Sequence, residues 1–398
     1  MLASSAMVLL MVPGLALFYG GMVRRKNVLA TMMMSFVAMA IVGVQWVLVG
    51  YALSFGHSHG GLIGWDNELF ALQGVSHQKL FADKAIPELV FVMFQGKFAI
   101  ITPALISGAI AERMRFRSFL VFTVLWTTLV YCPLAHWVWA DGGWLFKLGV
   151  LDFAGGTVVH IAAGVSALVL ALMVGARKDV EKGHAILPNN LVLTLTGAGL
   201  LWFGWFGFNA GSAVAADHPV AGAVAGLAFT TTQSAAAAAG IMWMLVERWH
   251  HGKITSLGLA SGIVAGLVAV TPAAGHIRPA AALLLGATAS VVCYSAVQLK
   301  SRLGFDDSLD AFGVHGVGGI WGALLVGALC FTPVAASLEQ VGKQALGVLA
   351  AAAFAGIGTF VIAQALKRLW GLRVSEQQER DGLDVHVHGE RGYHFDQV

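Results

Sequence analysis

The sequence predicts an all-α integral membrane protein with eleven transmembrane helices, arranged as an inverted 5+5 repeat followed by an eleventh helix. Three observations lead to this prediction. First, 58% of the 398 residues are hydrophobic and only 11% are charged, whereas a soluble domain carries about 25% charged residues. Second, Lys and Arg are abundant in every other loop. Third, one spacing of Asp and His occurs in both halves of the chain.

The helices are predicted from apolar length. A membrane-crossing helix needs about 20 mostly apolar residues. Charge clusters and Pro, Gly or Asn residues divide the chain into eleven such segments: 2–23, 28–55, 87–111, 118–138, 153–175, 188–211, 219–246, 257–274, 279–298, 311–332 and 343–369. The 49 glycines favour a tight helix bundle, because small residues let membrane helices approach closely. The alternating segments of about ten residues that form a β-barrel are not found.

The distribution of Lys and Arg predicts the orientation. When the eleven segments alternate in direction, 18 of the 24 Lys and Arg fall on one side. They lie at 24–26, 113–117, 177–182, 248–253, 300–302 and 367–391. Since cytoplasmic loops are enriched in these residues, we expect the N-terminus outside, the C-terminus in the cytoplasm and the protein in the cell (inner) membrane. The first segment precedes its positive cluster, so it is predicted to be a helix and not a signal peptide. Its start at residue 2 leaves open a longer N-terminus.

Composition divides the chain into two parts. Residues 1–370 are predicted to form the transmembrane domain, with repeats at about 1–175 and 188–335, and residues 371–398 a polar cytoplasmic tail. The tail either docks on the membrane domain or a partner, or is a disordered end. The three cysteines, Cys132, Cys293 and Cys330, lie in apolar segments without paired spacing. We expect them to be buried hydrophobic side chains and not disulfides or metal ligands.

The repeated motif places a His eight residues after an Asp. Asp152 precedes His160 at the outer end of the fifth segment, and Asp307 precedes His315 at the inner end of the tenth. This opposite placement is what an inverted repeat predicts, with the substrate path at the repeat interface. An ionisable side chain inside a bilayer is costly and usually marks a permeation route. The alternative is a chance match between two short runs.

The two histidines are the predicted site, and glycines flank both. Burial disfavours a charged imidazolium, so His160 and His315 are expected to be neutral. A neutral imidazole has one donor and one acceptor nitrogen, so two rings in contact would line a path for a small polar solute. The alternative for each is a structural hydrogen bond. Asp152 is expected to cap its helix or to attract cations, and Asp307, beside Asp306, to act similarly at the inner face.

Aromatic side chains gather in two of the segments. They are Phe91, Phe94 and Phe98 in the third segment, and the run from Trp202 to Phe208 in the sixth. Asn209 and Ser212 follow the second run directly. Trp139 ends the fourth segment, where an indole face can bind a desolvated cation by about 2 kcal/mol. The alternative is that these rings only anchor the helices at the bilayer interface.

At these residues the chain resembles the ammonium transporter (Amt/Rh) superfamily, on its bacterial Amt side. The matching runs are FYGG at 18–21, AERMRF at 111–116, DFAGGTVVH at 152–160, GWFGFNAGS at 204–212, FGVHGVGG at 312–319 and the tail runs 379–384 and 388–390. The resemblance covers essentially the whole chain. It implies a homotrimer in membrane lipid, each eleven-helix protomer having its own pore for ammonium or ammonia. It also implies that a PII-family signalling protein docks on the cytoplasmic face.

The resemblance also implies roles for individual residues. Substrate binding in an outer vestibule is implied for Trp139, Phe98, Ser212 and Phe94, gating for Phe98 and Phe208, pore lining for His160 and His315, and structural or recruiting roles for Asp152, Asp307, Asp310 and Asn209. No cofactor, metal or nucleic acid is expected. Lys97 departs from the family pattern beside Phe98, and we expect it to face away from the pore and to snorkel or to pair with an acid.

Function is expected to follow from desolvation. NH4⁺ and K⁺ are similar in size, but only NH4⁺ can lose a proton and so avoid the cost of carrying a charge through an apolar tube. We therefore expect recruitment followed by deprotonation. The alternatives are an ammonium sensor, a Rh-like gas channel and an unrelated ion-coupled transporter. The tail of about 27 residues has no added signalling domain, which favours a transporter. An enzyme is not expected, because the histidines have no nearby nucleophile or metal-ligand set.

Overall fold

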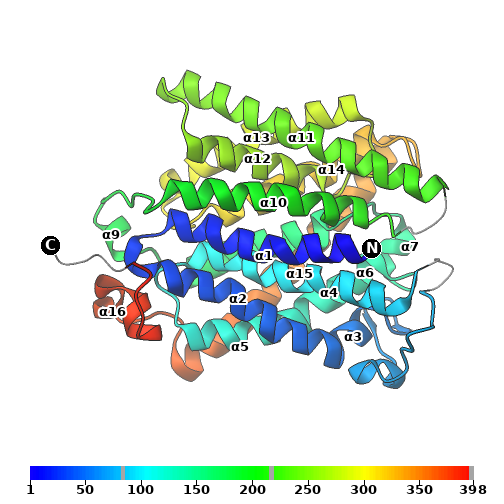
Figure 1. Ribbon diagram of the computed structural model, residues 1–398, viewed down its shortest axis with the longest axis horizontal. Helices are drawn as coiled ribbons and strands as arrows, with labels where there is room; N and C mark the ends of the chain where they lie inside the picture. Colours follow the sequence, from blue (N-terminus) through cyan, green and yellow to red (C-terminus); the bar gives the residue numbers. More distant parts are fainter. Residues whose placement is uncertain (82–85, 215–218, 394–398) are drawn as a thin grey trace.

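The long helices of the protein lie side by side along one common direction (Figure 1). The computed structural model describes residues 1–81, 86–214 and 219–393. At one end of the bundle lie α3 (Tyr51–Phe55), α6 (Cys132–Trp139) and α7 (Trp144–Leu148), and at the other α9 (Lys178–Glu181) and α16 (Glu376–Asp381). We call the first the hairpin end, after a β-hairpin that follows α3, and the second the tail end.

The remaining elements follow in chain order, with η marking a 3-10 or π-type turn. The first half contains α1 (Leu2–Met22), η1 (Arg25–Asn27), α2 (Val28–Gln45), η2 (Trp46–Gly50), β1 (Ser58–His59), β2 (Ile63–Gly64), η3 (Asn67–Leu72), α4 (Glu88–Ile110), α5 (Phe116–Trp126), η4 (Thr127–Tyr131), η5 (Gly156–Ile161) and α8 (Ala162–Val174). The second half contains α10 (Leu191–Gly211), α11 (Pro219–His251), α12 (Ser256–Val270), α13 (Pro279–Leu303), η6 (Phe312–Gly316), α14 (Val317–Leu329), α15 (Leu338–Trp370) and η7 (Asp384–His388). The two strands pair antiparallel, with Ser58 opposite Gly64.

Each of the eleven predicted segments coincides with one helix or with consecutive helical turns. Within the described residues, nine helices are long and apolar enough to cross a membrane. α12 has 15 residues and is shorter, and α11 is not among the nine. The all-helical, multi-pass architecture is therefore as predicted, whereas eleven crossings, the inverted repeat and the division at residue 370 stay predictions.

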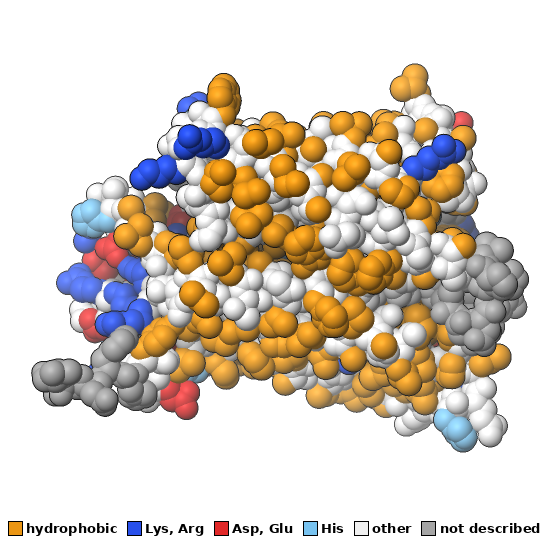
Figure 2. Space-filling model, turned by 45° about the horizontal axis from the view of Figure 1, so that its top comes forward, with side chains coloured by type: hydrophobic (Ala, Val, Ile, Leu, Met, Phe, Trp, Pro, Cys, Tyr) orange, Lys and Arg blue, Asp and Glu red, His pale blue; other side chains and the backbone are white. Residues whose placement is uncertain are grey.

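The surface agrees with a membrane environment. Hydrophobic side chains cover the flank of the bundle, and charged side chains gather toward its ends (Figure 2). Exposed apolar residues include Phe203 on α10, Phe229 on α11 and Phe360 on α15. Exposed large hydrophobic surface of this kind marks contact with lipid or with another chain.

Glycine brings α1 and α10 into backbone contact. A Cβ added at Gly197 would lie 2.3 Å from the backbone nitrogen of Phe18, so a larger residue would force the two helices apart. Asn190 directly precedes α10, and its side chain accepts hydrogen bonds from the amides of Val192 and Leu193 and so caps the helix. Because α1 and α10 are the first long helices of the two halves, this contact joins the halves.

The C-terminal segment, described to residue 393, docks on the body. Ser375 and Gln378 form a capping box that starts α16. The Asp384 carboxylate then accepts hydrogen bonds from the amides of Leu29 (3.1 Å) and Ala30 (2.8 Å) at the start of α2. Leu383 is buried. Of the options open from the sequence, docking on the membrane domain is the one observed for these residues.

Candidate functional site

The centre of the candidate site is a contact between the two predicted histidines. The Nδ1 atoms of His160 and His315 are 3.2 Å apart, and the rings are nearly parallel at 19°. His160 lies in η5 and His315 in η6, and both are buried. Gly164 permits the approach, since a Cβ there would lie 2.1 Å from the backbone nitrogen of Gly316. The spacing therefore places the two halves of the chain in direct contact at these rings.

Asp152 caps the turn that carries His160. Its carboxylate accepts hydrogen bonds from four backbone amides, of Gly155, Gly156, Thr157 and Val158, at 2.6–3.1 Å. A carboxylate here is favoured because the first amides of a helix have no partner within it. Burial nevertheless raises the pKa of the Asp152 carboxyl above its usual value, against these hydrogen bonds.

Asp307 caps the turn that carries His315, at the opposite end of the bundle. Its carboxylate accepts hydrogen bonds from the amides of Ala311 (3.0 Å) and Phe312 (2.8 Å). The Lys300 ammonium donates to the Asp307 carbonyl (2.8 Å) and pairs with the Asp310 carboxylate. Burial raises the pKa of the Asp307 carboxyl to about 6, although the charge of Lys300 acts in the opposite direction.

The predicted gate is a stacked ring pair. The Phe98 and Phe208 rings are 4.1 Å apart and inclined at 29°. Phe94 and Trp139 both meet Phe98 edge to face, at 4.9 and 5.9 Å. The Trp139 indole is fixed because its Nε1 donates to the Asp152 carbonyl (2.9 Å). The structure therefore brings all three predicted aromatic side chains to Phe98.

Ser212 and Asn209 lie at the end of the same helix but differ in their contacts. The Ser212 hydroxyl donates to the Phe208 carbonyl (2.9 Å), so its oxygen lone pairs remain available as acceptors. The Asn209 amide is fully buried and donates to the Thr232 hydroxyl (2.9 Å). Asn209 therefore joins α10 to α11.

Two narrow cavities run past the histidines. The first is lined by Met11, Leu15, Phe18, Ile101, Leu105, Val159, His160, Leu201, Trp205, Phe208, Val264 and His315, and the second by Phe18, Tyr19, Met22, Ser261, Val264, Leu309, Asp310, Val314 and His315. Each has a volume of about 10 Å³, close to the smallest that holds one water molecule. Because Phe18, Val264 and His315 line both, the cavities follow one another from the Phe208 ring to Asp310.

Trp205 is a site residue that the sequence reasoning did not single out. Its ring stacks on His160 at 5.4 Å and 19°, and its Nε1 donates to the Thr271 hydroxyl (2.9 Å). The available signal was helical spacing, because Trp205 lies three positions before Phe208 and so on the same helix face. Trp202, three positions earlier, does not line either cavity.

Lys97 contributes to neither cavity. It is half-buried on α4. Among the described residues it makes no ion pair. Of the two expectations for this residue, pairing with an acid is not seen in the described part of the chain.

A larger cavity of about 520 Å³ opens at the hairpin end. Its lining includes Trp139, Phe55 and Phe81, and the exposed charged residues Asp141 and Lys147. It therefore adjoins the ring that also contacts Phe98.

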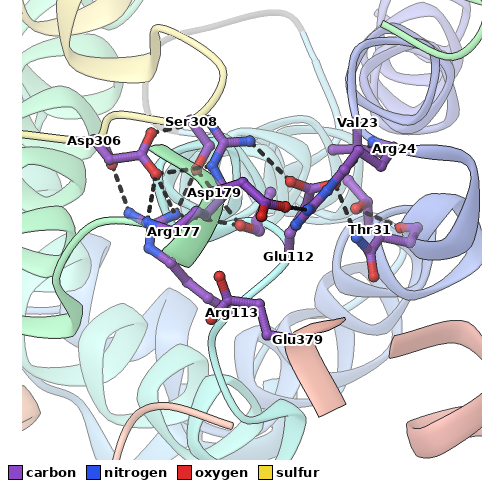
Figure 3. A network of polar contacts seen from close by, with 12 residues as sticks. Val23, Arg24, Thr31, Glu112, Arg113, Arg177, Asp179, Asp306, Ser308 and Glu379 are labelled. Carbon is purple, nitrogen blue, oxygen red and sulfur yellow. Dashed lines mark hydrogen bonds and ion pairs between the residues drawn. The ribbon is translucent and has the colours of Figure 1, made fainter. Parts of the chain in front are cut away.

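An ionic network that was not predicted closes the tail end (Figure 3). The buried Glu112 carboxylate accepts hydrogen bonds from the Arg24 guanidinium (3.0 Å) and from Arg177 (2.9 Å). Arg177 also binds both oxygens of Asp306 (2.8 and 2.9 Å). Burial alone would raise the pKa of the Asp306 carboxyl, but Arg177 and Arg113 hold it at about 2. Arg177 and Arg24 likewise lower the pKa of the Glu112 carboxyl against the effect of its burial, so both carboxylates are ionised at neutral pH.

This network reaches the tail through Glu379. The Glu379 carboxylate accepts a hydrogen bond from the amide of Lys178 (2.7 Å) and pairs with Arg373 (2.7 Å). Arg373 in turn donates to the Val174 carbonyl (3.2 Å), three residues before Arg177. The charged residues are visible in the sequence, but their contacts with one another could not be predicted, because they lie in loops far apart in the chain.

The comparisons with known proteins agree on one family. A model described as Ammonium Transporter Family matches residues 1–393. An ammonium transporter of Bacillus subtilis (strain 168) is 48% identical over 399 residues, which cover 97% of this chain and 96% of that protein. Ammonium transporter Amt1 of Archaeoglobus fulgidus is 44% identical over 399 residues, which cover 98% and 97% of the two chains.

Solved structures share the fold. One titled Sensor Amt Protein has a TM-score of 0.89 and 31% identity, over 97% of this chain and 96% of that chain. Saccharomyces cerevisiae Mep2 has a TM-score of 0.83 and 37% identity, over 94% and 86% of the two chains. The resemblance found in the motifs is confirmed by these matches along nearly the whole length: the chain belongs to the ammonium transporter family.

Proposed function

We propose that the chain is an ammonium transporter of the cell (inner) membrane. It takes NH4⁺ at the hairpin end, removes its proton and conducts NH3 past His160 and His315 to the tail end, with or without separate transfer of the proton. The observation that supports this most is the histidine pair in a narrow, otherwise apolar cavity that begins at the stacked gate ring Phe208.

The small volume and the apolar lining of the cavities favour a neutral transported species. An ion in an apolar cavity this narrow would lose its water without gaining replacement charge, at a cost of many kcal/mol. NH3 carries no charge and is close to water in size. K⁺ cannot be neutralised, so the same passage discriminates against it.

The Nδ1–Nδ1 hydrogen bond constrains the tautomers of the pair. One ring must donate through Nδ1 and the other must accept. The two Nε2 atoms are then one acceptor and one donor. His160 Nε2 is buried and has no hydrogen-bond partner among the described residues. It is therefore free to hydrogen-bond a passing NH3, as acceptor or donor according to the tautomer.

Recruitment is assigned to the hairpin end of this path. The indole face of Trp139 can contribute about 2 kcal/mol or more to the binding free energy of a cation when water is excluded. The Ser212 oxygen offers an acceptor, and Phe98 with Phe208 separates this vestibule from the cavity. Phe94 buttresses Phe98 edge to face.

Assembly and placement are part of the same proposal. We assign eleven crossings in an inverted 5+5 repeat, the hairpin end to the outside and the tail end to the cytoplasm, because Lys and Arg concentrate at the tail end. Residues 1–370 form the transmembrane domain, in a homotrimer surrounded by lipid. Residues 371–398 form the cytoplasmic tail, and a PII-family protein docks on that face.

An ammonium sensor is the second candidate, because one of the matched structures is titled Sensor Amt Protein. A Rh-like gas channel is a third, and it would conduct NH3 without a current. Both differ from the transporter in a measurable way.

The test is the ammonium-evoked current of proteoliposomes on a solid-supported membrane, with K⁺ as the control ion and an internal-pH dye in the same vesicles. A saturable ammonium current that is absent with K⁺ supports electrogenic transport. Dye response without current identifies NH3 conduction. Absence of both, in folded protein that binds ammonium, identifies a sensor. His160→Ala should alter the response, whereas His250→Ala, an exposed His outside both cavities, should not.

A further inference from the structure

Two glutamines lie buried in the apolar helix α15. Gln340 and Gln344 are 4% and 1% exposed. A buried amide is costly unless its hydrogen bonds are made. The Gln344 amide makes four: its Oε1 accepts from Leu151 N (2.7 Å) and Gln340 Nε2 (3.2 Å), and its Nε2 donates to Leu151 O (2.8 Å) and Ala323 O (2.9 Å).

These contacts join both histidine-bearing helices. Leu151 immediately precedes Asp152, whose carboxylate caps the turn that contains His160. Ala323 lies on α14, which continues directly from the turn that contains His315. One side chain therefore bridges the approach to the first histidine and the helix that follows the second.

The same segment also holds the vestibule ring. The Asp152 carbonyl accepts the hydrogen bond of Trp139 Nε1 (2.9 Å). Gln340 Nε2 donates to the Gly149 carbonyl (2.9 Å), two residues before Leu151. The two glutamines thus hydrogen-bond the backbone between Gly149 and Leu151, and the adjoining Asp152 carbonyl hydrogen-bonds Trp139.

We propose that Gln344, assisted by Gln340, is a positioning residue for transport: it sets the placement of Trp139 and of the two histidine-bearing helices relative to one another. This inference rests on the proposed function. Gln344 touches no substrate, because it lines none of the cavities described above. Its effect is transmitted through Leu151, Asp152 and Ala323.

Gln344→Leu keeps most of the side-chain volume and removes all four hydrogen bonds. We expect it to raise the apparent KM for ammonium about tenfold and to lower discrimination against K⁺, since a shift of about 1 Å in a distant support costs up to a hundredfold. Gln340→Leu, which keeps the Gln344 contacts to Leu151 and Ala323, should raise KM only about twofold. If Gln344→Leu folds poorly, the KM of Gln340→Leu still tests the proposal.

The control is Ser290→Ala. Ser290 is buried, and its hydroxyl donates to the Ala239 carbonyl (2.6 Å). This bond joins α13 to α11 and contacts neither the 149–152 segment nor a histidine-bearing helix. A merely structural loss should lower the yield of folded protein in both variants and leave the KM of the surviving protein unchanged.

Two further measurements separate positioning from general damage. In a Trp139→Leu background, the KM effect of Gln344→Leu should shrink below about threefold, because the coupling of two linked residues is not additive. Hydrogen exchange at amides 155–158 should accelerate in Gln344→Leu and not in Ser290→Ala, because only the first change loosens the Asp152 cap.

Unchanged KM, unchanged discrimination and unchanged exchange in Gln344→Leu would overturn the inference. Exchange does not depend on transport, so the positioning claim is tested even if the wild type carries no ammonium. In that case the proposed function fails while the exchange result still decides the role of Gln344.

Discussion

The two ends of the path use the same Asp–His spacing in different surroundings. At the hairpin end, the Asp152 carboxylate is held by four backbone amides, and its carbonyl anchors Trp139. At the tail end, Asp307 accepts two comparable amide bonds and a longer one from Gly313 (3.5 Å), and lies against the Lys300–Asp310 pair. The first cap rests on backbone alone, and the second adjoins an ionic network.

This difference in surroundings implies that the two caps respond differently to pH and salt. A cap held only by backbone amides has no neighbouring ion pair, so we expect its geometry to change little with salt. A cap beside Lys300, Asp310 and the Asp306–Arg177 pair changes its charge state when its surroundings change, because charges a few ångströms apart in a buried site interact strongly. The tail end is therefore the responsive end.

The largest expected effect comes from Asp152→Ala. It leaves four amides without a partner at the start of the turn that carries His160, each costing about 1–3 kcal/mol. We expect an ammonium current at least about a hundredfold lower, measured at equal amounts of folded protein. Asp307→Ala should lose less, and Asp152→Asn, which keeps one acceptor oxygen, should fall between. Equal losses in the two alanine variants would contradict the comparison.

Next in size is Arg177→Gln at the tail end. This change leaves the buried Glu112 and Asp306 carboxylates without their shared partner. Removing one side of a buried ion pair costs about 3–5 kcal/mol, so the unfolding midpoint in detergent should fall markedly. Arg373→Gln removes one pair with the buried Glu379, which keeps its hydrogen bond from the Lys178 amide, so its cost should be smaller than that of Arg177→Gln, which removes the partner of two buried carboxylates. The account fails here if both variants are equally stable.

The third prediction concerns pH. The pKa of Asp307 is raised to about 6 from an ordinary 3.8, so the native state binds more protons than the unfolded state between these values. Its contribution to stability is therefore gained as pH falls from 6 toward 4 and lost as pH rises through 6. Asp306, with its pKa held at about 2, does not titrate in this window.

Unfolding midpoints of the wild type and Asp307→Asn, measured from pH 4 to 8, test this directly. The midpoint of the variant minus that of the wild type should increase from pH 4 to pH 7, because only the wild type carries the cost of a buried charge above pH 6. A constant difference across the range would show that Asp307 is not the responsive group. Lys300, Asp310 and Arg113 face it and are unchanged in both proteins.

The smallest expected effect lies in the large cavity at the hairpin end. Asp141 and Lys147 are exposed there, near Trp139, and their charges act oppositely on an approaching cation. We expect Asp141→Asn to raise the apparent KM about twofold at low ionic strength and Lys147→Gln to lower it by a similar factor, both effects vanishing near 0.5 M salt because charges are screened. Shifts of the same sign would rule out a charge effect.

Much of the helical architecture could be predicted because it depends on local composition. Long apolar runs must be helical in a membrane, where every backbone group needs an internal partner. The helix boundaries were predicted less accurately. The segment predicted at 343–369 forms a helix that begins at Leu338, five residues before the predicted start, because Ser337 caps it there. The segment predicted at 257–274 ends at Val270, just before Pro272.

The contact between His160 and His315 was anticipated from a repeated spacing, whose two copies are 155 positions apart. Trp205 was not, although its position three residues before Phe208 places it on the same helix face, because the aromatic run from Trp202 to Phe208 was treated as one cluster. The Gln344 bridge to Leu151 and the Glu112–Arg177–Asp306 network join segments that only the folded chain brings together. Charge counting can place such residues on one side of a membrane, but not pair them.

The most direct test of the central claim is the ratio of ammonium to K⁺ current in His160→Ala and His315→Ala, measured separately beside the wild type in the same vesicles. The account predicts that each variant loses at least about tenfold in ammonium rate or in this ratio, because each breaks the Nδ1–Nδ1 contact. Wild-type rate and selectivity in both variants would contradict a role for the histidine pair in deprotonation and conduction.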